Sequence, residues 1–100
     1  MDVELWRGDN KEAYTNVPHI IKQHSPTGFE WGYNGSGPAD LALNILYQFI
    51  GYEAQKLYHE FKDDFIAVAP RNGTTIPGYV IVAWLQERGY LKDAERLEDF

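Results

Sequence analysis

Alternating apolar and polar positions at the start of the chain predict two short strands. Residues 3–7 read Val-Glu-Leu-Trp-Arg, which alternates as a half-buried strand does. Residues 13–17 form a plausible return strand that stops at Pro18, because proline has no N–H to donate to a ladder. The Gly-Asp-Asn between the two segments is typical of a turn, so together they predict a β-hairpin.

A third strand is predicted where aromatic residues alternate with other side chains. Phe29, Trp31 and Tyr33 alternate with Glu30 and a glycine. On a strand, the three rings point to one face and Glu30 points to the other. We expect the rings to belong to the core, with Tyr33 the most exposed of them. With the hairpin, this segment predicts a small antiparallel sheet within residues 3–33.

Apolar residues spaced three and four apart predict helices in the rest of the chain. Residues 38–50 are apolar except for a stripe of Asp40, Asn44 and Gln48, so we expect a central helix that is packed on most sides. Asp40 would lie near the positive end of the helix dipole. Residues 52–68 have one apolar and one charged face, which predicts a second helix.

The last third of the chain carries conflicting signals. Residues 79–85 are rich in β-branched side chains, which favours a strand, whereas Pro77 before them and a glycine soon after them favour a helix. We expect a helix over residues 78–88, and apolar positions three apart suggest a short acidic helical tail at 91–97. The whole pattern predicts one α+β domain, residues 1–100, in which the sheet packs on the central helix and two further helices cover it.

Composition narrows the possible functions. One hundred residues, 44% hydrophobic and 24% charged, fit one globular domain. The chain has no cysteine, which excludes disulfides, thiolate catalysis and cysteine-type zinc sites. No apolar run approaches the roughly 20 residues that span a bilayer. The first residues lack an export signal, so we expect a cytoplasmic protein without a membrane partner.

The net charge of the chain indicates which kinds of partner it can bind. The net charge is −6, from fifteen acidic and nine basic residues. Direct binding to nucleic acid is not expected, because phosphates attract a positive protein surface. The acidic excess fits a protein that meets basic surfaces of other proteins, or it serves solubility. Aromatic residues make up 15% of the chain, and we expect some of them at the surface as contact residues.

A glycine-rich corner joins the predicted third strand to the central helix. Glycine-rich turns that open a helix can bind phosphate through free amides and the helix dipole. The glycines at 28–37 match neither the P-loop nor the dinucleotide spacing, Pro38 lacks a donor, and Asp40 adds a negative charge. We therefore favour a tight structural corner, in which Asn34 tolerates positive φ and the backbone amides are engaged inside the fold.

The same stretch carries a family resemblance. From His24 to Leu43 it reads H-S-P-T-G-F-E-W-G-Y-N-G-S-G-P-A-D-L-A-L. It resembles the pattern H-S-P-x-G-F-E-W-G-Y-G-G-S-G-P-A-x-L-A-L of an uncharacterised domain-of-unknown-function family of short bacterial, archaeal and phage proteins. Weaker similarity extends to residues 83–85. The chain departs at Asn34, which is the next best residue after glycine for positive φ. The resemblance implies a prokaryotic or phage origin and brings no activity with it.

His24 and Glu30 are the best candidate pair of polar residues. They flank the turn at Pro26 and would meet across it, where a buried His–Glu contact raises the histidine pKa and suits acid–base catalysis. Alternatively, His24 hydrogen bonds to backbone carbonyls of the turn. His59 begins a sequence like a zinc motif but lacks the second histidine, so no metal site is expected. We assign no catalytic residue and no cofactor.

Three functions remain open from the sequence. We favour a non-enzymatic binding protein of prokaryotic or phage origin, an inhibitor or adaptor that acts on a host protein. The first alternative is a small-molecule or nucleotide binder that uses the glycine-rich corner. The second is a small hydrolase or transferase that uses His24 and Glu30. The candidate ligand- or partner-binding residues are His24, Glu30, Trp31, Tyr33, Asn34 and Ser36.

Overall fold

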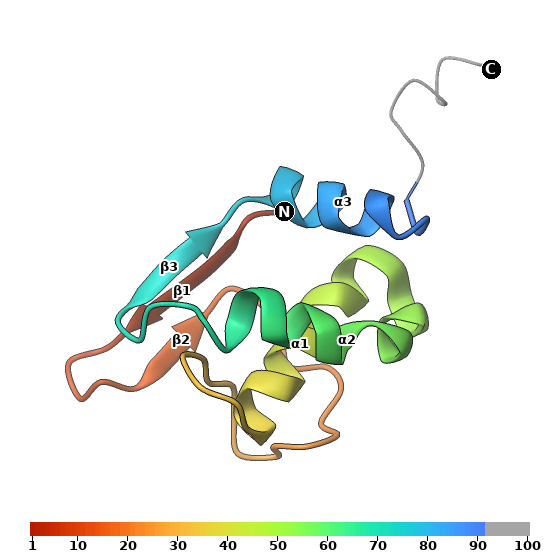
Figure 1. Cartoon of the computed structure of the whole chain (residues 1–100). Helices are drawn as coiled ribbons and strands as arrows, with labels where there is room; N and C mark the ends of the chain where they lie inside the picture. Colours follow the sequence, from red (N-terminus) through yellow and green to blue (C-terminus); the bar gives the residue numbers. More distant parts are fainter. Residues whose placement is uncertain (92–100) are drawn as a thin grey trace.

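The computed structural model describes residues 1–91 and has the predicted α+β fold (Figure 1). The helical tail expected at 91–97 lies, apart from its first residue, outside the described residues. The elements in chain order are β1 (Val3–Arg7), β2 (Ala13–Thr15), α1 (Ser36–Ile50), η1 (Gly51–Lys56), α2 (Tyr58–Phe61), η2 (Lys62–Ile66), β3 (Gly73–Ile76) and α3 (Gly78–Glu87). Of these, η1 is a 3₁₀ helix and η2 is a π-helical turn.

The sheet has three antiparallel strands in the order β2-β1-β3. The hairpin of β1 and β2 confirms the alternating pattern, and Trp6 of β1 lies opposite Tyr14 of β2. On the other side of β1, Trp6 lies opposite Gly73 of β3. The third strand is therefore residues 73–76, and the predicted strand at 29–33 is wrong.

Residues 29–33 form no strand, and the chain bends at Gly32. This glycine has φ 87, in the left-handed region that glycine adopts readily, and its N–H donates to Ile66 O at 3.0 Å. Trp31 is fully buried, and its indole N–H donates to Arg71 O at 3.2 Å. The segment is thus fixed by contacts to η2 and to the approach to β3. Tyr33 is exposed, as expected.

Helix α1 is the central helix of the fold. It begins at Ser36, two residues before the predicted start, and Gly35 precedes it with an extended backbone. It ends at Ile50 and is followed by Gly51, whose φ of 64 lies in the left-handed region and whose N–H donates to Tyr47 O. Every residue from 37 to 46 is buried, which confirms a helix packed on most sides.

Two of the three polar stripe residues of α1 are fully buried and hold the preceding loop. The Asp40 carboxylate accepts three backbone N–H bonds at 2.9–3.1 Å, from Gln23, His24 and Ser25. The Asn44 side chain accepts the N–H groups of residues 20 and 21 at 2.8 Å and donates to the carbonyl of residue 21. Buried polar groups need such partners. Asp40 therefore holds residues 23–25 against α1 through these amides, a role that the dipole argument missed.

The predicted helix at 52–68 is broken into three short turns. Leu57, with φ −123, interrupts the helical backbone between η1 and α2. The apolar spacing still places Tyr58 and Phe61 in the core, whereas Val68 is exposed. The predicted helix at 78–88 is confirmed as α3.

The N-terminal strand and α3 are joined at their ends. The N–H of Gly78, the first residue of α3, donates to Asp2 Oδ1 at 2.7 Å. Figure 1 shows the N-terminus beside the start of α3 and the sheet projecting to one side of the helices. The core lies between the inner face of the sheet and the helices, and its largest fully buried side chains are Trp31 and Phe61. No helix in the described part of the chain is long and apolar enough to cross a membrane.

Candidate functional site

A cationic pocket lies at the inner side of the sheet, near the hairpin loop. Its volume is about 440 Å³. Three basic residues and one acidic residue line it, and their formal charges sum to +2 in a chain whose net charge is −6. Its lining residues are Arg7, Lys11, Glu30, Arg71 and Asn72.

Arg7 is the most firmly held residue of the cationic pocket. It ends β1, and the alternation that buries Val3 and Leu5 points Arg7 inward too. Its guanidinium carbon lies 4.2 Å from the centroid of the buried Trp31 ring, a cation–π contact. Nη1 donates to Glu30 Oε1 at 2.8 Å, and Nε donates to Arg71 O at 2.7 Å. These contacts fix the guanidinium before any ligand arrives.

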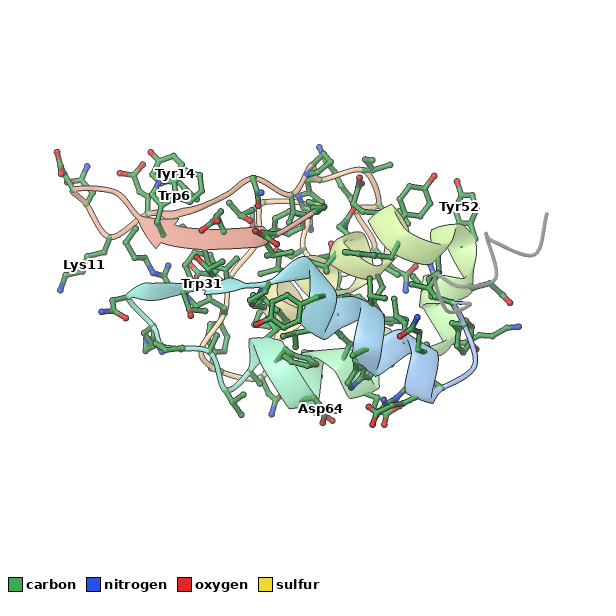
Figure 2. The ribbon with its side chains drawn as sticks, turned by 90° about the horizontal axis from the view of Figure 1, so that it is seen from above. Trp6, Lys11, Tyr14, Trp31, Tyr52 and Asp64 are labelled. Carbon is green, nitrogen blue, oxygen red and sulfur yellow. The ribbon has the colours of Figure 1, made fainter. Side chains whose placement is uncertain are left out.

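The other two basic side chains of the cationic pocket have no carboxylate partner among residues 1–91. The Arg71 guanidinium lies 5.7 Å from the centroid of the Tyr33 ring. Lys11 lies in the hairpin loop with φ 65, the left-handed region. Figure 2 shows Lys11 at the far end of the hairpin. Unpaired cations around a fixed arginine attract anions.

A second hollow of about 310 Å³ lies at the glycine corner. Among its lining residues are Glu30, Tyr33 and Ser36 of the predicted set, and Glu30 is shared with the cationic pocket. A Cβ on Gly37 would lie 2.9 Å from Glu30 Cβ, so glycine allows this close approach.

Only some of the backbone N–H groups at the glycine corner and the start of α1 are hydrogen-bonded within the fold. The Ala39 N–H donates to Gly35 O at 3.0 Å. The N–H groups of Ser36 and Gly37 meet no acceptor in the part of the chain that the structure describes. The expectation that the corner amides are all engaged is therefore wrong. The hollow consequently borders the open N-terminal end of α1.

The predicted pair of His24 and Glu30 does not form. His24 Nε2 lies 2.6 Å from the Tyr58 hydroxyl, and Glu30 pairs with Arg7. The alternative, in which the His24 ring bonds carbonyls of the turn, is not observed either, because within residues 1–91 its hydrogen-bonding partners are the Tyr58 hydroxyl and the Gln23 side chain. Asn34 is exposed and makes no side-chain hydrogen bond to residues 1–91. Of the six candidates, Glu30 lines the cationic pocket. The Trp31 and Tyr33 rings lie next to the guanidinium groups of its Arg7 and Arg71.

An aromatic face covers the outer side of the sheet, and the sequence reasoning did not single it out. We define the aromatic face as Glu4, Trp6, Glu12, Tyr14 and Thr75. The Trp6 and Tyr14 rings stack with centroids 6.1 Å apart and planes 16° from parallel, and they are 47% and 44% exposed. Figure 2 shows them on the side of the sheet away from Trp31. The alternation at residues 3–7 already places Trp6 opposite the core, so this signal was present.

Two carboxylates border the stacked rings. The Tyr14 hydroxyl donates to Glu12 Oε2 at 3.4 Å, and the Thr75 hydroxyl donates to Glu4 Oε1 at 2.6 Å. All five residues of the aromatic face are exposed. The outer side of the sheet is therefore aromatic and acidic, whereas the inner side carries the cationic pocket.

Comparison with known proteins places the chain in one family. The model of a family of unknown function, DUF6166, matches residues 3–87. No curated protein matches the chain. No solved structure matches it either.

Proposed function

We propose that this chain, which belongs to that family of unknown function, is a non-enzymatic binding protein of prokaryotic or phage origin. It acts on a host protein as an inhibitor or adaptor and works in the cytoplasm. The observation that carries the proposal is the aromatic face, where Trp6 and Tyr14 are stacked and exposed on an open sheet.

The stacked rings suit a protein interface for an energetic reason. Tryptophan and tyrosine dominate the binding energy of protein interfaces, because they bury a large area at little cost in side-chain entropy. Stacking on Tyr14 already restricts the Trp6 ring, and Gly73 opposite Trp6 adds no side chain beside it. A partner would therefore bury a surface that is ordered in advance, which improves affinity.

The charges of the aromatic face favour a basic partner surface. Glu4 and Glu12 lie beside the rings, at the positions two residues before Trp6 and Tyr14. An arginine or lysine of the partner would stack on Trp6 and pair with these carboxylates. This fits the net charge of −6.

A pull-down from bacterial lysate tests the proposal. The wild-type chain should capture a specific host protein, and Trp6→Ala and Tyr14→Ala should each abolish capture. Tyr52→Ala is the matched control, because Tyr52 is an exposed aromatic residue outside the aromatic face. Failure to capture any protein across several hosts, or equal loss with Tyr52→Ala, would count against the proposal.

Small-molecule binding at the glycine corner is a second candidate function. It is favoured by the hollow of about 310 Å³ and by the open N–H groups of Ser36 and Gly37. A nucleotide or metabolite that binds there should raise the melting temperature, because a ligand of the folded state stabilises it. Ser36→Ala keeps the N–H group but removes a hydroxyl from a residue that lines the hollow, and it should reduce that rise. A flat response to a broad library would remove this candidate.

Hydrolase or transferase activity has less support. It depends on His24 and Glu30 acting together, and the two side chains have separate partners, Tyr58 and Arg7. We therefore do not propose a reaction for this site.

A further inference from the structure

The cationic pocket is a ligand site that neither the aromatic face nor the glycine corner explains. We infer that it binds a small dianion, either a phosphate monoester or a dicarboxylate. The inference goes beyond the proposed function, because it does not depend on a protein partner. It rests on the fixed Arg7, on Lys11 and Arg71, which pair with no carboxylate of residues 1–91, and on a cavity of about 440 Å³.

Arg7 provides a preorganised anchor. Its side chain is 15% exposed, and Glu30, the Arg71 carbonyl and the Trp31 ring hold three sides of the guanidinium. Nη2 donates to no residue of the described chain, so it is available for an oxyanion. Because Glu30 balances the Arg7 charge, a ligand meets a positioned donor without an isolated buried cation.

The positive charges of Lys11 and Arg71 attract an anionic ligand to the cationic pocket. In the described residues, the basic side chains without a carboxylate partner are Lys11, Lys22 and Arg71, and two of these three line the cationic pocket. Lys11 has φ 65, where glycine or asparagine is normally favoured. A lysine in that conformation is unfavourable for folding and therefore points to a use for its ammonium group.

Charge and size set the class of ligand. Three cations and one carboxylate leave two positive charges, which match a dianion. A volume of about 440 Å³ suits a small organic anion, since ligand pockets span roughly 300–1,000 Å³. Asn72 adds an amide that can bond a hydroxyl or carbonyl of the ligand. Phosphate monoesters and dicarboxylates share this chemistry, and experiment separates them.

An NMR titration at constant ionic strength tests the inference with inorganic phosphate and with succinate as probes. The indole N–H of Trp31 is the reporter, because it donates to Arg71 O at 3.2 Å. We expect its resonance to shift and saturate at millimolar concentrations of at least one probe. The indole signals of Trp6 and Trp84 should stay in place. Saturation by phosphate identifies a phosphate site, and saturation by succinate alone identifies a carboxylate site.

Matched charge variants complete the test. Lys11→Gln and Arg71→Gln should each weaken binding of the probe about tenfold, because each removes one charge-assisted contact. Lys22→Gln removes the same charge from an exposed position outside the pocket and should leave affinity unchanged. If neither probe saturates, or if Lys22→Gln weakens binding as much as Lys11→Gln, the inference is overturned. Should Arg71→Gln fail to fold, Lys11→Gln decides.

Discussion

Removal of the Asp40 carboxylate should destabilise the fold more than most single substitutions. Asp40 is fully buried and accepts backbone N–H bonds from residues 23, 24 and 25 at 2.9–3.1 Å. Asp40→Ala leaves these three donors without their acceptor. At the low end of about 1 kcal/mol for each unsatisfied amide, the loss is about 3 kcal/mol. Alanine has the higher helix propensity and recovers about 0.5 kcal/mol of it.

Two further variants separate hydrogen bonding from packing. Asp40→Asn keeps the side-chain shape but turns an NH₂ group toward the backbone donors, so it should also destabilise the fold. Gln48→Ala changes the exposed member of the same polar stripe and should stay within about 0.5 kcal/mol of the wild type.

Urea unfolding followed by circular dichroism measures these differences. We expect Asp40→Ala to lower the free energy of unfolding by about 2–3 kcal/mol, a large share of the roughly 5–15 kcal/mol typical of a domain. The midpoint should fall with little change in the slope, because the surface exposed on unfolding is similar. If both Asp40 variants unfold with the free energy of Gln48→Ala, the reasoning is refuted.

Three other predictions follow from single contacts. Lys11→Gly should raise the free energy of unfolding by about 1 kcal/mol, because a non-glycine residue with φ 65 is strained; thermal unfolding measures it, and lower stability would contradict it. Gly73→Ala should lower it by about 3 kcal/mol or more, because φ is 114 and a Cβ would overlap Leu5 O; a urea midpoint equal to that of the wild type would disprove this. A hydrogen bond from Arg88 holds the Glu60 pKa below its usual 4.5, so the small contribution to stability is present above pH 4.5 and is lost as the pH falls further. Glu60→Gln should therefore remove this part of the pH dependence of the melting temperature. Melting curves recorded across acid pH measure it, and an unaltered pH dependence would argue against the prediction.

Hydrophobic spacing and flanking residues correctly predicted β1, α1 and α3. The period-two alternation of residues 3–7 predicted β1, and the same alternation accounts for Trp6 lying away from the core, which was not predicted. The dense apolar run and the closing Gly51 gave α1. At residues 79–85 the β-branched composition favoured a strand and the flanking residues favoured a helix, and the segment is the helix α3. Its buried residues Ile81, Trp84 and Leu85 are spaced three and one apart, so they lie on one face of that helix.

Features that depend on distant parts of the chain were not predictable. Residues 29–33 alternate like a strand, but the N–H of Gly32 pairs with Ile66, and the sheet takes Gly73–Ile76 instead. The cationic pocket brings Arg7, Glu30 and Arg71 together from three separate segments. The spacing of residues along the sequence does not show which distant residues come into contact in the fold. The same limit explains why His24 pairs with a tyrosine in α2 and not with its neighbour across the turn.

The central claim is that a host protein docks on the aromatic face, and site-specific photocrosslinking tests it most directly. A photoreactive phenylalanine analogue in place of Tyr14 should form a covalent adduct with one host protein in a bacterial lysate. The same analogue in place of Tyr52, a ring outside the aromatic face that is even more exposed than Tyr14, should form no such adduct. An adduct that forms equally from both positions, or from position 52 alone, would contradict the claim.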